Sequence, residues 1–213
     1  MAATLLMFFY APTEAVQGNV QRILYVHVPS AWIAYLAFIM VAVCSILVLA
    51  RRQDWQRFDR IASASAELGV VFTTLVLALG SIWGHRVWGA WWVWDARLTS
   101  TLVLWLIYLG YLVFRAMSPA GERRARLSAV IGIVGAVDIP VIHFAVTWWR
   151  TLHPGAIAPM PGGDTIPASM TITLLVSLVA FTVLFAVLLT LRIRLAEAAD
   201  RVDAIETLEP ARV

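Results

Sequence analysis

Long runs without charged residues limit this chain more than any other feature. Positions 31–50 hold twenty consecutive uncharged residues, which as a helix would extend about 30 Å, the thickness of the hydrocarbon core of a bilayer. Only 14% of the 213 residues are charged, whereas a soluble domain carries about a quarter. The sequence therefore predicts an all-α integral membrane bundle formed by a single domain, residues 1–213. The other clear expected spans cover residues 68–83, 98–114, 127–149 and 167–191.

The amino-terminal apolar stretch is shorter than the other runs. Residues 1–10 carry no charge, but as a helix they would extend only about 15 Å, half of a bilayer core. We interpret them as the end of a first transmembrane helix that either is short here or starts upstream, which brings the expected set to six. Residues 11–30 then form a polar connection, in which Pro29 and Ser30 mark the start of the second helix.

The arginines indicate how the helices cross the membrane. All 16 basic residues are arginine, and twelve of them fall in three segments that alternate with segments holding the other four. Because cytoplasmic segments of membrane proteins collect basic residues, the arginine-rich set is expected in the cytoplasm and the opposite set in the periplasm, across a bacterial inner membrane. Arginines placed between apolar runs contact the lipid bilayer surface and argue against a nucleic-acid partner. The arginine-rich segments are 51–66, 115–126 and the tail from 192, and the opposite ones are 11–30, 84–97 and 150–166.

One segment on the predicted outer face is unusually rich in tryptophan. Five of the twelve residues at positions 83–94 are tryptophan. Trp88, Trp91 and Trp92 are spaced so that, on a helix, they would share one face. Such an aromatic shelf suits a flat, mostly apolar, anionic ligand, although tryptophans also gather at membrane interfaces without any ligand. The expected ligand contacts are Trp83, Trp88, Gly89, Trp91, Trp92 and Trp94, with Asp95 and Arg97 at the end of the segment.

The chain has four histidines, and all of them fall on the predicted outer side. His27 and His153 lie in the two loops that flank the tryptophan segment. Neutral imidazole is the usual ligand of haem iron, so two imidazoles from separate loops could bind a flat macrocycle from opposite sides. The alternative for each is a loop histidine without a ligand. We interpret His85 as an interfacial side chain and His143 as an interhelical hydrogen-bonding residue.

The outer arginines are candidates for pairing with an anionic ligand. A porphyrin carries two propionates, and guanidinium groups pair well with carboxylates. Arg150 is the strongest candidate because it lies three residues before His153. Asp95 and Arg97 are better placed for partner docking or ring orientation, and the alternative for them is a local ion pair.

Two further residues restrict the chemistry. Asp138 lies near the middle of the fifth span, two residues before Pro140; it is either functional, as intramembrane carboxylates often are, or bonded locally where proline loosens the helix. Cys44 is the single cysteine, which excludes an intramolecular disulfide, a CxxC thiol pair and a covalent CxxCH haem site.

The motif WGAWWVWDARLT at 88–99 resembles the tryptophan-rich signature of the haem-handling membrane proteins of cytochrome c maturation. With YVHVP before the second span and TLH after the fifth, the chain is similar to the haem exporter protein C (CcmC) family. The resemblance implies that His27 and His153 are axial ligands of a non-covalent haem b. It also implies periplasmic delivery of haem to a membrane-anchored haem chaperone, together with ABC transporter subunits and a small membrane subunit.

We therefore expect a haem-binding delivery module rather than an enzyme. One alternative is a haem-containing membrane electron-transfer subunit, which usually needs histidines towards both faces. The other is a small-solute transporter, which often shows repeated halves and polar groups at the midplane, and no internal repeat is visible here. The larger haem–cytochrome c ligase shares the tryptophan signature but is expected to need more spans than this chain can form.

Overall fold

The computed structural model describes residues 1–149, 153 and 167–208 of the chain. Every regular element assigned in these ranges is helical. Three elements are short: the α-helix α1 (Ala2–Leu5), the π-helix η1 (Leu6–Tyr10) and the 3₁₀-helix η2 (Asn19–Ile23). The longer ones are α2 (Leu24–Ala50), α3 (Trp55–Trp88), α4 (Ala96–Met117), α5 (Glu122–Ala136), α6 (Asp138–Trp148) and α7 (Ala168–Leu208).

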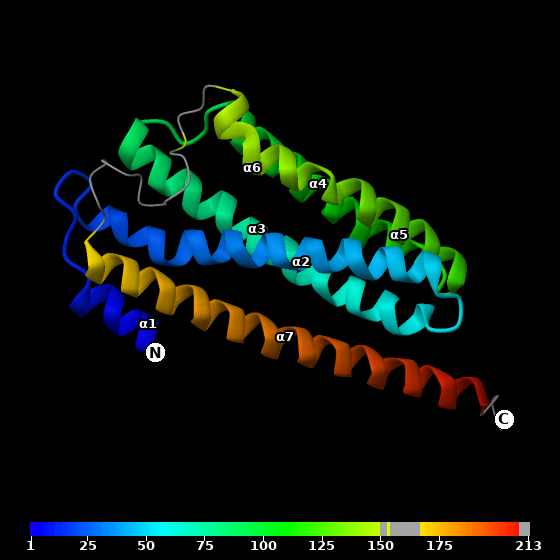
Figure 1. The fold of residues 1–213 in the computed structure, drawn as a ribbon. Helices are drawn as coiled ribbons and strands as arrows, with labels where there is room; N and C mark the ends of the chain where they lie inside the picture. The colour runs from blue at the N-terminus through cyan, green and yellow to red at the C-terminus, as the bar shows by residue number, and fades with distance from the viewer. Residues whose placement is uncertain (150–152, 154–166, 209–213) are drawn as a thin grey trace.

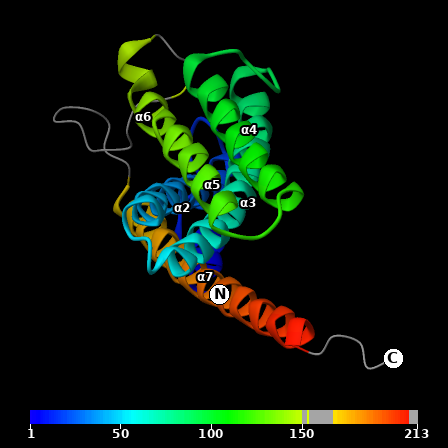
Figure 2. The same cartoon turned by 90° about the vertical axis from the view of Figure 1, so that its right-hand side faces the viewer.

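The long helices form an elongated bundle around α2 and α3, which pack against each other along their length (Figure 1). In the perpendicular view, α4, α5 and α6 lie on one side of this pair and α7 on the other (Figure 2). Five helical segments in the described part of the chain are long and apolar enough to cross a membrane. The all-α membrane bundle predicted from the sequence is therefore confirmed.

The expected short first helix corresponds to α1 and η1 together. These nine residues extend about 14 Å as a helix, which is less than half of a bilayer core. They pack beside α7 (Figure 1), and the guanidinium of Arg22 donates a hydrogen bond to the carbonyl of Met7. The segment is therefore fastened to the bundle at one end and does not span a bilayer by itself.

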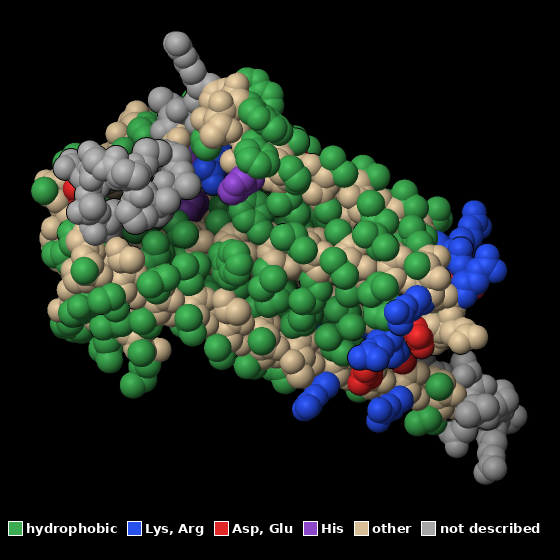
Figure 3. Space-filling view, in the orientation of Figure 1, with side chains coloured by type: hydrophobic (Ala, Val, Ile, Leu, Met, Phe, Trp, Pro, Cys, Tyr) green, Lys and Arg blue, Asp and Glu red, His purple; other side chains and the backbone are tan. Residues whose placement is uncertain are grey.

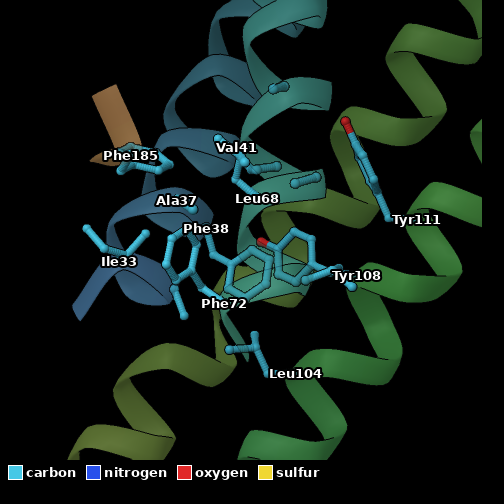
Figure 4. Packing of buried hydrophobic residues seen from close by; sticks show 14 of the residues in the cluster. Ile33, Ala37, Phe38, Val41, Leu68, Phe72, Leu104, Tyr108, Tyr111 and Phe185 are labelled. Atoms are coloured by element: carbon cyan, nitrogen blue, oxygen red, sulfur yellow. The ribbon is translucent and has the colours of Figure 1, made fainter. Parts of the chain in front are cut away.

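Aromatic side chains from α2, α3 and α4 form the centre of the core (Figure 4). Phe38 stacks on Tyr108 with ring centroids 3.9 Å apart and an angle of 14° between the planes. The hydroxyl of Tyr108 donates a hydrogen bond of 2.8 Å to the carbonyl of Gly132, which ties α4 to α5. Because a tyrosine hydroxyl buried in an apolar interior needs a partner, this bond fixes how the two helices pack.

Several boundaries differ from the prediction. Helix α2 begins at Leu24, so Pro29 lies inside the helix rather than at its start. The segment 51–66, expected to be a polar loop, is mostly the first part of α3, which begins at Trp55. Both errors have one cause: polar residues and a proline were taken as helix boundaries, whereas tertiary packing extends each helix beyond its apolar run.

The expected interruption of the fifth span is present. Helices α5 and α6 meet at Val137, which keeps a helical backbone conformation (φ −62°, ψ −25°) but whose N–H donates to the carbonyl of Val134, three residues earlier, at 3.2 Å. Pro140 has no N–H to donate to the carbonyl four residues earlier, which loosens the helix at this point. Asp138 becomes the first residue of α6 and makes no side-chain cap there.

Charged side chains gather at one end of the bundle, the arginine end, which carries the α2–α3 and α4–α5 connections and the carboxyl end of α7 (Figure 3). There Arg115 of α4 makes a two-pronged ion pair of 2.6 and 2.8 Å with Asp59 of α3, and both side chains are about one-tenth exposed. Arg192 of α7 also forms an ion pair with α3, donating a hydrogen bond of 2.7 Å from Nε to one carboxylate oxygen of Glu67. The sequence indicated the basic charge of this end but not that its arginines are paired across helices.

Candidate functional site

The tryptophan segment does not form a single helical face. Trp88 is the last residue of α3, and Gly89 follows in the left-handed conformation, with φ of 75°. Its N–H donates to the carbonyl of His85, as in a common helix termination. Residues 89–95 are then non-helical up to the start of α4. The expected shelf of Trp88, Trp91 and Trp92 on one helix face is therefore wrong, because a glycine that readily adopts positive φ ends the helix inside the motif.

After Gly89 the chain folds back along the end of α3. The hydroxyl of Ser81 donates a 2.7 Å hydrogen bond to the carbonyl of Trp91. The Trp91 ring stacks on His85, with centroids 4.1 Å apart and planes 18° apart, and it is 59% exposed. His85 is thus the support of an exposed tryptophan, in keeping with its interpretation as an interfacial side chain.

Two further tryptophans of the segment pack against each other. Trp92 and Trp94 meet edge to face, with centroids 5.6 Å apart. Trp94 is 76% exposed, whereas the indole N–H of Trp92 is buried and has no hydrogen-bond partner among the described residues. The segment therefore combines a buried indole donor with two broadly exposed rings.

His27 lies in a buried position on the first turns of α2, not in a loop as predicted. Its side chain contacts Trp83 of α3 edge to face, at 5.8 Å between centroids. Gly80 lies opposite the ring, so closely that a Cβ there would be 3.1 Å from His27 Cε1. The backbone of Val76 lies close enough to interact with the ring, but the Nδ1 atom is buried and makes no hydrogen bond of standard geometry in the described part of the chain. A buried imidazole nitrogen without a partner is costly, and a ligand would satisfy it.

His153 is brought to the same end of the bundle by contacts with α3 and α4. Its ring meets Trp88 edge to face, with centroids 6.4 Å apart. Its Nδ1 lies 3.3 Å from a guanidinium nitrogen of Arg97. His27 is close enough to both groups for electrostatic interaction. The structure thus brings the two predicted histidines into one site, and α3 supplies a tryptophan ring that contacts each of them edge to face.

Asp95 and Arg97 have different roles at the start of α4. One carboxylate oxygen of Asp95 accepts a 2.7 Å hydrogen bond from the backbone N–H of Leu98, which caps the helix. Arg97 points away from this cap, to His153 and to the neighbourhood of the Tyr35 hydroxyl on α2. The local Asp95–Arg97 ion pair considered from the sequence is not formed: the cap fixes the helix start, and the guanidinium is directed into the site.

The remaining predicted residues lie at the edge of the site that holds His27 and His153, or outside the described ranges. Arg150 falls outside them. Asp138 is close enough to Tyr35 for electrostatic interaction, and its Oδ2 is buried with no partner among the described residues. His143 contacts Phe144 of its own helix at 5.0 Å between centroids.

The segment before η2 packs over the site from the amino-terminal side. Trp83 donates an indole hydrogen bond of 2.8 Å to the side chain of Gln17. Glu14 accepts hydrogen bonds from the backbone N–H groups of Gln17 and Val16, and these bonds lower the pKa of its carboxyl group. The turn is thereby ordered and holds Trp83 in place against His27.

Sequence reasoning missed Tyr35 and Gly80 as neighbours of the predicted ligands. Tyr35 follows His27 by about two helical turns, a spacing that is informative only if α2 is extended back to Leu24. Gly80 has no side chain to attract notice, and its role is to leave room for the His27 ring. Neither signal is visible until the helix boundaries are known.

The donor set favours a macrocycle that brings its own equatorial ligands. Protein sites for bare metal ions such as zinc generally use three or four side-chain ligands, and no group of three His, Cys, Asp or Glu side chains suited to a metal occurs among the described residues. Two imidazoles, tryptophan edges and a guanidinium fit an iron porphyrin, which needs only axial nitrogens, apolar contacts and partners for its carboxylates. The residues present therefore fit haem.

Fold and site together define a multi-pass helical membrane protein with an aromatic, histidine-bearing site at one end of its bundle. The family model described as "Heme exporter protein C" matches residues 1–207. The chain is 38% identical to the "Heme exporter protein C" of Bradyrhizobium diazoefficiens, over 95% of this chain and 76% of the relative, and 37% identical to that of Escherichia coli K12, over 88% and 74%. It is also 40% identical to a "Putative cytochrome c biosynthesis ccmC-like mitochondrial protein" of Arabidopsis thaliana, over 87% and 69%.

The chain belongs to the haem exporter protein C family. Membership assigns it to haem handling in cytochrome c maturation, as a multi-pass membrane protein. The resemblance inferred from the tryptophan motif is therefore confirmed, while the roles of individual site residues stay predictions.

Proposed function

We propose that the protein binds non-covalent haem b at the tryptophan-bearing end of the bundle, through His27 and His153 as axial ligands. The observation that carries this proposal is the buried His27, whose Nδ1 lacks a partner among the described residues in a site shared with His153 and Arg97. Trp83 and Trp88 each meet one of the histidines in an edge-to-face contact. Arg97 and Arg150 are the proposed partners of the propionates.

The site is proposed to face the periplasm of a bacterial inner membrane. The arginine-rich segments lie at the opposite end of the bundle (Figure 3), and basic residues collect on the cytoplasmic side. Haem would then be passed to a membrane-anchored periplasmic haem chaperone, with ABC transporter subunits and a small membrane subunit as further partners. We assign the protein no turnover chemistry of its own.

Two groups of residues in the tryptophan segment support a distinction between holding and presenting haem. Trp83 and Trp88 contact the proposed ligands, whereas Trp91 and Trp94 are mostly exposed. Exposed aromatic rings beside a ligand site are typical of surfaces that dock a partner. Gly89, Trp92 and Asp95 support this arrangement through the helix end, the packing against Trp94 and the cap of α4.

The experiment that tests the proposal is an absorption spectrum of the detergent-purified protein with added haem. The wild type is expected to give six-coordinate, bis-histidine haem. His27→Ala and His153→Ala should each weaken haem retention, and free imidazole should partly restore it by filling the vacant position. His143→Ala is the matched control and should leave the spectrum unchanged. Unaltered haem content in the double His27→Ala, His153→Ala protein would overturn the proposal.

A further inference from the structure

The contact between Arg97 and His153 is incompatible with coordination of iron by His153. A guanidinium carries only N–H donors and no acceptor. The Nδ1 atom of His153, 3.3 Å from Arg97 Nη1, must therefore offer its lone pair to Arg97. A neutral imidazole has one N–H and one lone pair, so the proton lies on Nε2.

Either route to a His153–iron bond requires Arg97 to move. Coordination through Nδ1 needs the lone pair that Arg97 occupies in this geometry. Coordination through Nε2 needs its proton to be transferred to Nδ1, and the new Nδ1–H would then point at a cation that cannot accept it. The neutral imidazole keeps one proton in both cases; only the position of the guanidinium has to change.

Nothing in the described part of the chain pairs Arg97 with a carboxylate. The described ion pairs involve Arg60, Arg115, Arg126 and Arg192. Two acidic residues lie in the same region, and neither forms an ion pair with Arg97 in the described ranges: one oxygen of Asp95 caps α4, and Asp138 is close enough to Tyr35 for electrostatic interaction. The guanidinium of Arg97 contacts two neutral groups, the imidazole of His153 and the hydroxyl of Tyr35. It is therefore a strong site for an incoming carboxylate, because charge-assisted pairs are stronger than bonds to neutral groups.

We propose that Arg97 is a carboxylate-responsive latch on His153. In the ligand-free protein it holds His153 in a form that does not bind iron, and a carboxylate on the bound ring draws it away and releases the imidazole. This inference rests on the proposed function. It adds that ligation by His153 depends on the propionates, so the site selects an iron porphyrin that bears free carboxylates.

The test compares ferric haem with its dimethyl ester, in which both propionates are esterified. In the wild type, haem is expected to give the six-coordinate spectrum. The ester is expected to bind through His27 alone, to stay five-coordinate, and to bind at least about tenfold more weakly. Arg97→Met removes the latch, so haem and ester should both become six-coordinate. The affinity difference that remains between them should be only what Arg150, the other proposed partner of the propionates, contributes.

Two further variants separate the latch from a general loss of structure. Arg97→Lys keeps a cation without an acceptor and should keep the discrimination between haem and ester. Arg86→Met is the matched control, because Arg86 is an exposed arginine that lines a different hollow, with Val16 and Gln17; it should behave as the wild type. Far-ultraviolet circular dichroism of each variant checks that the helices are intact.

The outcomes distinguish this inference from the proposed function. A six-coordinate ester complex in the wild type, or full discrimination retained by Arg97→Met, would overturn the latch and leave haem binding intact. A wild-type protein that binds neither porphyrin would overturn the proposed function and the latch with it.

Discussion

Replacing Gly80 by alanine should damage haem binding without damaging the fold. A Cβ at this position would lie 3.1 Å from Cε1 and 3.8 Å from Nδ1 of His27. The first contact is shorter than ordinary van der Waals separation, so the ring must shift by a few tenths of an ångström. Trp83 also packs against the His27 ring, with the two ring centroids 5.8 Å apart, and so limits where the ring can move. The added methyl group therefore acts on the proposed axial ligand directly.

The expected size follows from two opposed effects. Alanine in place of glycine in a helix interior stabilises by about 1 kcal/mol, while holding His27 away from its preferred rotamer costs about 0.5–1.5 kcal/mol. The free energy of unfolding should therefore change little. Haem affinity gains nothing from helix propensity and should fall by roughly two- to tenfold, since 1.4 kcal/mol corresponds to a factor of ten.

The assay is haem titration in detergent, followed by absorbance, beside thermal unfolding of the haem-free protein. Gly110→Ala is the matched control, because Gly110 lies within α4 and a Cβ there would meet no heavy atom within 4 Å. That variant should gain the helix stabilisation and keep wild-type affinity. Equal haem affinity in both variants, or equal loss in both, would refute the argument that Gly80 exists to make room for His27.

Three other results are expected. Asp59→Asn leaves its arginine partner charged and about one-tenth exposed, so it should cost about 3–5 kcal/mol of stability in thermal unfolding; Glu122→Gln, in an exposed pair of neighbouring helix turns, should cost under about 0.5 kcal/mol. A reporter active only in the periplasm should work when fused after Gly155, in the part of the chain outside the described ranges, and fail after Gly121; the reverse pattern would invert the proposed orientation. Trp91→Ala should lower haem transfer to the chaperone, measured by haem staining on a denaturing gel, more than it lowers haem bound to this protein, and undiminished transfer would reduce Trp91 to an interfacial anchor.

The sequence predicted the spans well because their signal is physical and local. A run of about twenty uncharged residues is stable across a bilayer only as a helix, since every backbone polar group must be bonded internally. The proline break near Asp138 is of the same kind, because a missing N–H acts on its own helix. These features need no knowledge of which helices are neighbours.

Helix boundaries near the site were harder to predict because they depend on packing between helices. Pro29 was expected to start α2, yet it is the sixth residue of that helix. The error placed His27 in a loop, whereas the structure buries it against α3. Tyr35 and Gly80 escaped notice for the same reason, since a residue two turns further along α2, or a glycine on the facing helix, becomes relevant only once His27 is known to be helical.

The tryptophan spacing misled for a different reason, and the difference bears on function. Positions 88, 91 and 92 would share a face only if the helix continued, but Gly89 ends it. The tryptophans are consequently divided into two sets: Trp83 and Trp88 meet the two histidines from α3, while Trp91 is exposed on top of His85. A continuous helix would have placed Trp88, Trp91 and Trp92 on one surface. The glycine that ends the helix is therefore what allows one short motif both to line the proposed haem site and to present an exposed aromatic surface beside it.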